Sequence, residues 1–525
     1  MPRLQAFPLL LALSLLSGCS RDVAAGTVAP APAAESTAAQ RHNPPQQTQA
    51  NVPNADASHE RTSIVRTETV ANVARRFLSR TKYMTVAELE TAIRDQNALA
   101  PKQLWLKPGT TLVIPGIEPQ PIVEHPRNDP ADMEVKAIYL TGATAGSANG
   151  LKMIEHWREV GGNAVVFDIK DSDGLTSIPF EHPLAPHNRH NIENLPKFVR
   201  WLHQHDMHAI ARVALFRDEH IARDFPRLAV QSRSALAAGK NPAPWNENGK
   251  QVWTDTSNPE VQAYDIALAK YVAQSGVDEV QFDYVRFPAE GAQKDAKFAF
   301  EAVHPEWKRA DVIADFLDRA YKELHPEGVL LSLDVFGVMA WQRQVDLAHT
   351  GQDIVRMSKH ADVISPMIYP SHFFNMDGYT GKDGHPLPGD APEHFIDMSM
   401  QRFDKITAGT GVVVRPWLQA FGWKTRTYSP EYVMKQIKVS KQDNGIGFLL
   451  WNARNDYAKP YVAMREMAGN PESYFETTST LAEKRRVRQA RVAAVSAPVT
   501  PAVVKTSTSS AMPKTAAPSA NMSQQ

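Results

Sequence analysis

Two short apolar segments of this 525-residue chain carry acidic residues at positions suited to chemistry. The segment "EVQFDYV" contains Asp283, and "LLSLDVF" contains Asp334. In both segments every second residue is bulky and apolar, so in a strand each aspartate lies on the opposite, inward face. An inward carboxylate needs a charged partner or a chemical task. On adjacent strands, about 4.8 Å apart, the two carboxyl groups would lie about 5–6 Å from each other, which suits acid and nucleophile work on a glycosidic bond.

Further polar and aromatic residues stand where similar segments end. Arg286 is expected to pair with Asp283 and keep it ionised, which makes Asp283 the nucleophile or base and Asp334 the acid. Asp168 is the reserve carboxylate. The alternative is that these aspartates only pair with Arg212, Arg286 or Lys170 to hold a rim together. The residues expected to contact a substrate are Asp168, Lys170, Arg212, Arg286, Tyr369, Trp417, Trp451 and Asn452.

A regular alternation of strands and helices must position these residues. Eight short apolar segments are separated by amphipathic helical stretches, which predicts a parallel sheet covered by helices and closed into a (β/α)8 TIM barrel over residues 132–470. A doubly wound open sheet is the alternative, but no glycine-rich fingerprint follows the first strand. In a barrel the C-terminal ends of the strands form the functional face. The expected strands are 135–143, 163–171, 208–216, 278–287, 329–337, 362–370, 411–421 and 445–453.

The two ends of the chain differ from this pattern. Residues 1–19 contain Arg3 and an apolar run that is too short to span a membrane, which predicts a secretory signal. Residues 20–60 are rich in Ala, Pro and Gln and predict a disordered tether. Residues 476–525 predict a low-complexity tail that holds one short basic helix, whose basic face would either be solvated or touch anionic lipid.

The only cysteine, Cys19, ends the sequence "LSGC", which resembles a bacterial lipobox. The resemblance implies cleavage before Cys19 and a lipid on its sulfur, with Ser20 permitting sorting to the outer membrane, facing the periplasm. A plain signal peptide is the alternative. The membrane is thus an expected partner through the N-terminal lipid.

Residues 61–118 form a separate small unit. Two helical segments, "VANVARRFL" and "TVAELETAIRDQNAL", precede a turn and a short strand in "LWLKPGTTLVIPG". This order resembles a LysM domain, a module that binds wall glycan, although the usual opening strand is not evident. The resemblance implies a small α+β domain that assists attachment to wall glycan; a structural copy without glycan binding is the alternative.

Several segments together resemble one family. "NAVVFDIKDSDG", "VDEVQFDYVRFP", "LSLDVFG", "DVISPMIYPSHF" and "GFLLWNARNDY" occur in the order found in a bacterial family of glycosyl hydrolase domains, and the match covers about 135–460. The resemblance implies a glycosidase-like (β/α)8 barrel. It does not supply a substrate.

Composition narrows the class of partner. The 57 basic and 57 acidic residues balance, so no global charge favours nucleic acid. His203, His205 and His208 are expected at the bottom of the barrel, away from the site. Because the barrel segments contain no cysteine and no tight set of Asp, Glu and His, no metal is expected at the site, and no other cofactor is expected either. The sequence therefore predicts a glycoside hydrolase that acts on a polysaccharide or peptidoglycan of the cell envelope. The alternative is a catalytically inactive glycan-binding lipoprotein, and the oligomeric state stays open.

Overall fold

The computed structural model describes residues 59–373, 376 and 387–496. The predicted signal segment, Cys19 and the tether up to residue 58 lie outside the described residues. So does the predicted tail from residue 497 onward.

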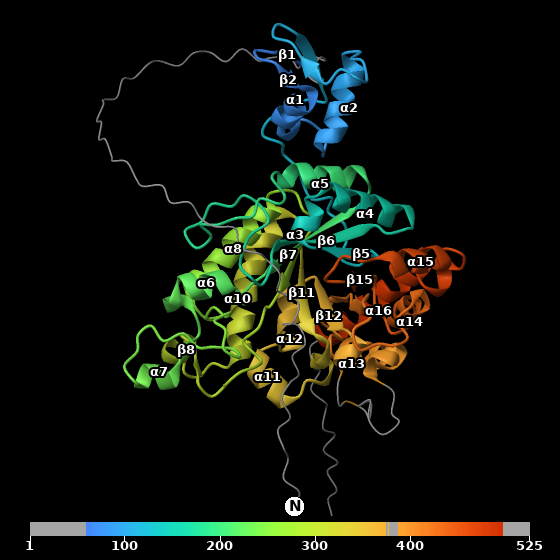
Figure 1. Ribbon diagram of the computed structural model, residues 1–525. Helices are drawn as coiled ribbons and strands as arrows, with labels where there is room; N and C mark the ends of the chain where they lie inside the picture. The colour runs from blue at the N-terminus through green and yellow to red at the C-terminus, as the bar shows by residue number, and fades with distance from the viewer. Residues whose placement is uncertain (1–58, 374–375, 377–386, 497–525) are drawn as a thin grey trace, which may run out of the picture.

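A closed barrel of eight parallel strand positions forms the body of the protein (Figure 1). Each expected segment contributes one position, and pairing of β11 with β12 and of β15 with β5 closes the ring. The predicted (β/α)8 fold is therefore confirmed. The barrel strands are β5 (Lys136–Leu140), β6 (Ala164–Lys170), β7 (His208–Ala214), β9 (Glu279–Asp283), β11 (Leu330–Phe336), β12 (Val363–Ile368), β13 (Val413–Val414), β14 (Trp417–Gln419) and β15 (Phe448–Trp451).

The seventh position differs from the sequence expectation, because its strand is split into β13 and β14. The break falls at Arg415 and Pro416, and a proline has no N–H to donate to a neighbouring strand. Val414 is still in register with Ile364, and Trp417 is in register with Met367. The split therefore keeps the strand in the barrel.

Helices cover the outside of the barrel, and their buried residues recur every three or four positions. In α10 the buried residues include Val312, Phe316 and Ala320, which form one apolar stripe toward the strands. Asn258 caps the start of α8, and Pro259 occupies the first helical position, where no N–H is needed. The longer barrel helices are α4 (Ala148–Glu159), α5 (Leu195–Gln204), α8 (Pro259–Ala273), α10 (Arg309–Leu324), α13 (Pro392–Ile406), α14 (Pro430–Gln442) and α15 (Ala458–Met467).

Shorter elements decorate the connections of the barrel. After β7 and β9, the loops carry a two-stranded antiparallel pair, β8 (Gln231–Ser232) with β10 (Ala296–Lys297). The short helices are α3 (Gly142–Ala145), α6 (Glu219–Asp224), α7 (Arg233–Ala237), α9 (Phe300–Val303), α11 (Gln344–Thr350) and α12 (Ile354–Met357).

The interior of the barrel is divided into an apolar half and a polar half. The apolar half is filled mainly from β5, β6, β14 and β15, with Tyr139, Val166, Trp417 and Leu449 among its buried residues. The polar half comes from β7, β9 and β11. Its buried, inward residues are His208, Arg212, Glu279, Gln281, Asp283, Ser332 and Asp334. Leu333 and Phe282 pack in the other core cluster, with residues of the covering helices, which confirms the predicted facing of these strands.

A small α+β domain precedes the barrel. Strand β1 (His59–Ser63) pairs with β4 (Thr111–Pro115), and β2 (Glu68–Thr69) pairs with β3 (Trp105–Leu106), both antiparallel. The helices α1 (Val70–Phe77) and α2 (Val86–Gln96) were predicted, and Thr85 with Glu88 forms a capping box on α2. The opening strand is present as β1. It was not evident in the sequence, because "HERTS" lacks the bulky apolar residues that mark a strand. Glycan binding by this domain stays a prediction.

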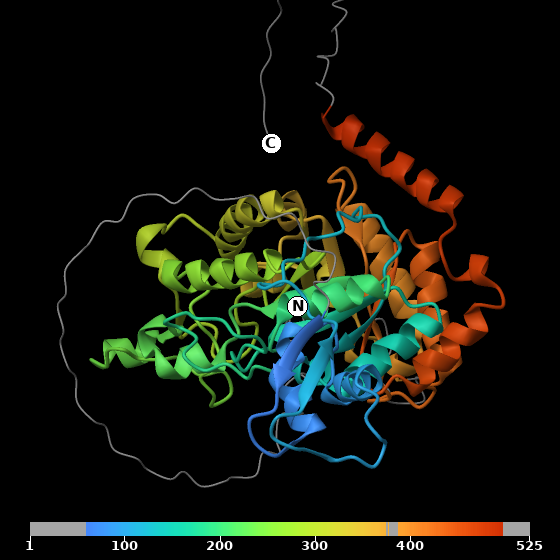
Figure 2. The same ribbon diagram turned by 90° about the horizontal axis from the view of Figure 1, so that it is seen from above.

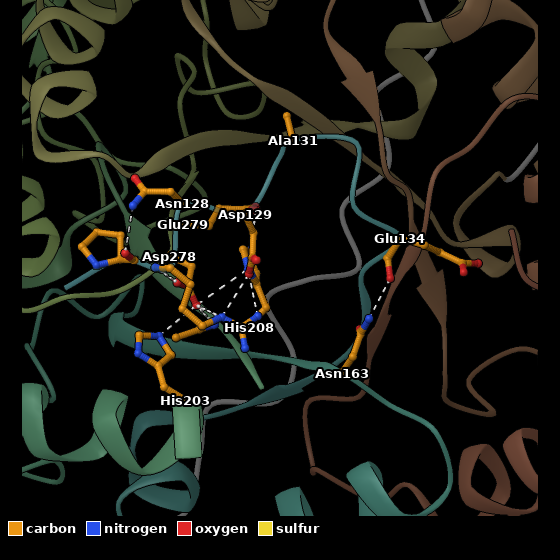
Figure 3. Close-up of polar contacts among 12 residues, drawn as sticks. Asn128, Asp129, Ala131, Glu134, Asn163, His203, His208, Asp278 and Glu279 are labelled. Carbon is orange, nitrogen blue, oxygen red and sulfur yellow. Dashed lines mark hydrogen bonds and ion pairs between the residues drawn. The ribbon is translucent and has the colours of Figure 1, made fainter. Parts of the chain in front are cut away.

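The segment between the small domain and β5 runs along α5 and then across the N-terminal end of the barrel, here called the floor. Arg200 of α5 bonds Glu118 and Glu124 of this segment. At the floor, Asp129 lies 3.0 Å from Nδ1 of His208, and the N–H of Arg127 donates to Asp278 at 2.8 Å. Figure 3 shows Asp129, Asp278 and Glu279 around His208. The connecting segment is therefore part of the barrel's packing.

The C-terminal helix α16 (Thr478–Ser496) confirms the predicted basic helix, but most of its basic residues bind the protein itself. Arg485 and Arg488 both pair with Asp132 of the connecting segment, and Arg491 pairs with Asp404 of α13. Lys484 pairs with Glu476. Figure 2 shows α16 as the red helix at the edge of the molecule. In the described parts of the chain, no helix has the length and apolar content needed to cross a membrane.

Candidate active site

Arg212 lies at the centre of the polar half of the barrel, at the C-terminal ends of the strands. Its Nη2 lies 2.6 Å from Oδ2 of Asp283, and its Nη1 lies 2.5 Å from Oδ1 of Asp168. Its Nε lies 3.2 Å from Oδ2 of Asp283 and 3.9 Å from Oδ2 of Asp334. One buried cation thus joins three carboxyl groups carried by β6, β9 and β11. Both predicted aspartates face the interior and meet at the same guanidinium.

Asp283, the last residue of β9, is the most open of the three carboxyl groups. Its side chain is 11% exposed, against 3% for Asp168 and 1% for Asp334. Arg212 donates to Oδ2, and the N–H of Tyr284 donates to Oδ1 at 2.6 Å. Both carboxyl oxygens of Asp283 therefore accept a hydrogen bond from the protein.

The backbone just after Asp283 is strained. Tyr284 has a φ of +52°, a left-handed conformation that is unfavourable for a residue with a bulky side chain. This conformation turns the chain sharply at the end of β9 and brings the N–H of Tyr284 back onto Asp283. Such strain is kept when the surrounding structure and a site require it.

Asp334 is held in a different environment from Asp283. Trp417 Nε1 donates to its Oδ1 at 2.6 Å. Burial raises the pKa of Asp334 well above its ordinary value, and the neighbouring charge of Asp283 raises it further. Two neighbouring carboxyl groups in such different environments suit acid and base catalysis.

Asp168 adds a third carboxyl group to the same network. Its Oδ2 accepts the hydroxyl of Tyr139, and its Oδ1 accepts from Arg212. Burial raises the pKa of Asp168 to about 7, although Arg212 opposes that change. Tyr139 was not singled out from the sequence, because in "KAIYL" it reads as one more apolar strand residue.

Aromatic rings line the network on its apolar side. Tyr139 stacks on Trp451 with ring centroids 4.1 Å apart, and Trp417 meets Trp451 edge-on at 5.8 Å. The guanidinium of Arg212 lies 5.6 Å from the ring of Trp451. Trp417 and Tyr369 are buried, whereas Trp451 is half-buried. Of these rings, Trp451 has the most surface for a sugar.

The expectation that Lys170 faces the barrel mouth is wrong. A register shift between Asp168 and Lys170 puts Lys170 level with the outward residue Val213, so strict alternation fails at the end of β6. Its Nζ lies 2.9 Å from Asp265 of α8 and 3.1 Å from Asp218, and it has no exposed surface. Lys170 therefore ties β6 to the helical layer.

The expectation that Arg286 pairs with Asp283 is also wrong. Arg212, on the neighbouring strand, takes that role. The guanidinium of Arg286 instead lies 4.3–5.2 Å from the ring centroids of Trp253, Tyr284 and Phe336. The chain turns at Tyr284, so alternation along β9 no longer predicts where the Arg286 side chain points.

The side chain of Asn452 makes hydrogen bonds to other groups of the protein. Its Nδ2 donates to the carbonyl oxygens of Ala420 and Asp456, and its Oδ1 accepts from the N–H of Arg454. All of these bonds join the loops after β14 and β15. Asn452 therefore shapes the mouth of the barrel, and direct substrate contact by it stays a prediction.

The floor contains the described donor atoms that come closest to a metal site. Oxygens of Asp129 and Asp278 and a nitrogen of His208 lie within 4.8 Å of one another (Figure 3). These atoms already have partners, because Arg127 bonds Asp129 while His203 and the N–H of Ala209 bond Asp278. His208 also lies 3.3 Å from Glu279, which Arg415 neutralises at 2.8 Å.

Comparison with known proteins places this site in a family. Residues 137–457 match the family described as "Putative glycosyl hydrolase domain". The chain belongs to this family. The matched region of this glycosyl hydrolase domain runs from β5 to the start of α15, so it contains all three carboxyl groups and Arg212. A search of curated proteins found no match.

Solved structures similar to the glycosyl hydrolase domain include three bacterial proteins. A hypothetical protein from Ruminiclostridium thermocellum is 32% identical, with a TM-score of 0.32 over 38% of this chain and 97% of that chain. The PgaB (BpsB) glycoside hydrolase domain from Bordetella bronchiseptica is 13% identical, with a TM-score of 0.45 over 68% and 99%. A beta-N-acetylhexosaminidase from Bacteroides fragilis is 11% identical, with a TM-score of 0.40 over 77% of each chain.

Proposed function

We propose that this protein hydrolyses glycosidic bonds in a polysaccharide or wall glycan of the bacterial envelope. The carrying observation is the pair of carboxyl groups at the C-terminal ends of β9 and β11, which share Arg212 but differ in burial, with side chains 11% and 1% exposed. Asp283 acts as nucleophile or base, because it is the more open group and Arg212 donates to it at 2.6 Å. Asp334 acts as the acid, because burial raises its pKa.

The test uses a panel of polysaccharides and wall-glycan fragments, with products read by mass spectrometry. Asp283→Asn and Asp334→Asn preserve volume, so both variants should fold while turnover falls by about a thousandfold or more. Binding of the same glycans without turnover by the wild type would favour the inactive glycan-binding alternative. Full activity in both variants would reject the assignment of these aspartates.

We propose further that the protein is anchored to the outer membrane through lipid on Cys19 and faces the periplasm. The lipobox-like "LSGC" supports this proposal. Cys19→Ala should move the protein from the membrane fraction to the soluble fraction. Unchanged fractionation would mean that another feature holds it at the membrane.

A further inference from the structure

Two arginines beside Asp283 lack a carboxylate partner. Arg217 follows β7, and Arg286 follows β9; their guanidinium carbons lie 5.6 Å and 5.2 Å from the centroid of the Tyr284 ring. Within the described residues, neither guanidinium has a carboxylate at salt-bridge distance, and the side chain of Arg286 donates only to the carbonyl of Phe287. By contrast, Arg212 at the same end of the barrel bonds two carboxylates.

Because Arg286 is buried, the lack of a carboxylate at salt-bridge distance among the described residues costs free energy. Arg286 is only 7% exposed, and aromatic rings rather than acids surround it. Its acidic neighbours, Asp283, Glu247 and Glu290, act only at longer range, and burial lowers the pKa of the Arg286 guanidinium. A buried cation is normally neutralised by a carboxylate or another anion. Here the protein leaves that place open.

The two arginines lie close to the aspartates that are proposed to act on the substrate. Tyr284, which lies between them in the chain, directly follows Asp283, and Phe336 is two residues beyond Asp334 on β11. Arg217 is half-buried and Tyr284 is half-buried, so this group of side chains reaches the solvent. Trp253, whose ring lies next to that of Tyr284, has an Nε1 donor with no acceptor among the described residues.

We propose that Arg217 and Arg286 form a subsite for a carboxylate of the substrate, so that the glycan is an acidic one. This inference rests on the proposed hydrolase function and names its substrate class. A guanidinium binds a carboxylate through charge-assisted and often bidentate hydrogen bonds. The carboxylate would belong to a sugar next to the bond that Asp283 and Asp334 address.

The test measures binding to the full-length protein of two acidic glycans, each beside its carboxyl-reduced form. Hexuronate oligosaccharides carry the acid on the sugar ring, and cell-wall glycan strands carry it on a lactyl ether. We expect at least one acidic form to bind about tenfold tighter than its reduced form at low salt, and the preferred form identifies the source of the carboxylate. Equal affinity within both pairs would overturn the proposal.

Variants then assign the preference to these arginines. Arg217→Gln should remove the tenfold preference and leave the affinity for the reduced form unchanged, whereas Arg286→Lys keeps the charge and should retain part of it. Arg402→Gln is the matched control, because Arg402 also lies over a ring, that of Trp341 at 4.7 Å, but on α13. An equal loss for acidic and reduced glycans in Arg217→Gln would overturn the assignment. Absence of cleavage with the preference intact would count against the hydrolase function alone.

Discussion

The three carboxyl groups around Arg212 cannot be changed independently of one another. Asp168 and Asp283 share its guanidinium, and Asp283 raises the pKa of Asp334 by charge repulsion. Removing one negative charge therefore alters the proton affinity of the others, so the group titrates as a unit. Kinetic effects of single substitutions in this group will not add.

Replacing Trp417 by Phe should move the basic limb of the pH–rate profile to higher pH. The indole Nε1 donates to Oδ1 of Asp334 and lowers its pKa, which burial otherwise raises. Without this bond the acid keeps its proton to a higher pH, so activity is lost later as pH rises. The measurement is kcat/KM against pH. Trp451→Phe removes a similar volume without that hydrogen bond, and an equal shift in that control would contradict the explanation.

At this scale the sequence predicted that Asp283 and Asp334 turn inward, but it left three candidate partners for them, Arg212, Arg286 and Lys170. Alternation in "LLSLDVF" and "EVQFDYV" correctly placed Asp334 and Asp283 in the interior. The choice of Arg212 over Arg286 as partner depends on the register between β7 and β9, which brings Ala214 level with Asp283. Such register is a property of two distant segments, and neither segment alone contains it.

At the scale of elements, the shifted register at the end of β6 separates residues of similar sequence but different roles. Asp168 stays in the barrel interior, whereas Lys170 enters the layer between β6 and α8. Periodicity predicted all eight strand positions because their apolar residues are many and regular. It could not predict the shift at Lys170, because one extra residue in a strand leaves no mark on composition.

Lys170→Met should destabilise the protein without changing substrate affinity. The substitution leaves Asp218 and Asp265 as buried carboxyl groups without their cation, which costs about 3–5 kcal/mol. Urea unfolding should show this loss, while KM of the folded variant stays close to that of the wild type. A raised KM with an unchanged free energy of unfolding would instead indicate that Lys170 contacts the substrate.

At the scale of the whole molecule, the floor of the barrel joins the small domain, the barrel and the C-terminal helix. His208 bridges Asp129 of the connecting segment and Glu279 of β9, and Asp132 of the same segment binds Arg485 and Arg488 of α16. Sequence analysis placed the histidines at the bottom of the barrel correctly. It did not predict that the connecting segment supplies Asp129 and Glu124 as further partners, because this segment shows no strand or helix pattern.

The ionisable groups of the floor should lower the free energy of unfolding both at acidic pH and at alkaline pH. Hydrogen bonds with Asp129 and Glu279 raise the pKa of His208 above 6.5 despite its burial, so its contribution is complete below pH 6.5 and is lost as pH rises through the raised value. The pKa of Asp129 and that of Glu279 are lowered to about 2, so their contribution is lost as pH falls toward 2.

Unfolding experiments across this range give the check. The contribution of these floor groups to the free energy of unfolding should be greatest between about pH 4.5 and 6.5, and His208→Gln should reduce the decline on the alkaline side, to which the raised pKa values of Asp168 and Asp334 also contribute. His156→Gln is a suitable control, because His156 is a surface residue on α4. An unchanged alkaline decline in His208→Gln would assign it to another group.

The ion pairs around Asp132 also decide how the molecule carries a mechanical load. The chain enters the barrel through the connecting segment and leaves it through α16, and these two meet at Asp132 rather than at opposite ends. Tension applied between residues 59 and 496 therefore stretches the connecting segment and α16 against each other before it reaches the strands. The C-terminal ends of the strands, with Arg212 and its carboxyl groups, lie outside this path, so the site would keep its shape while the floor yields.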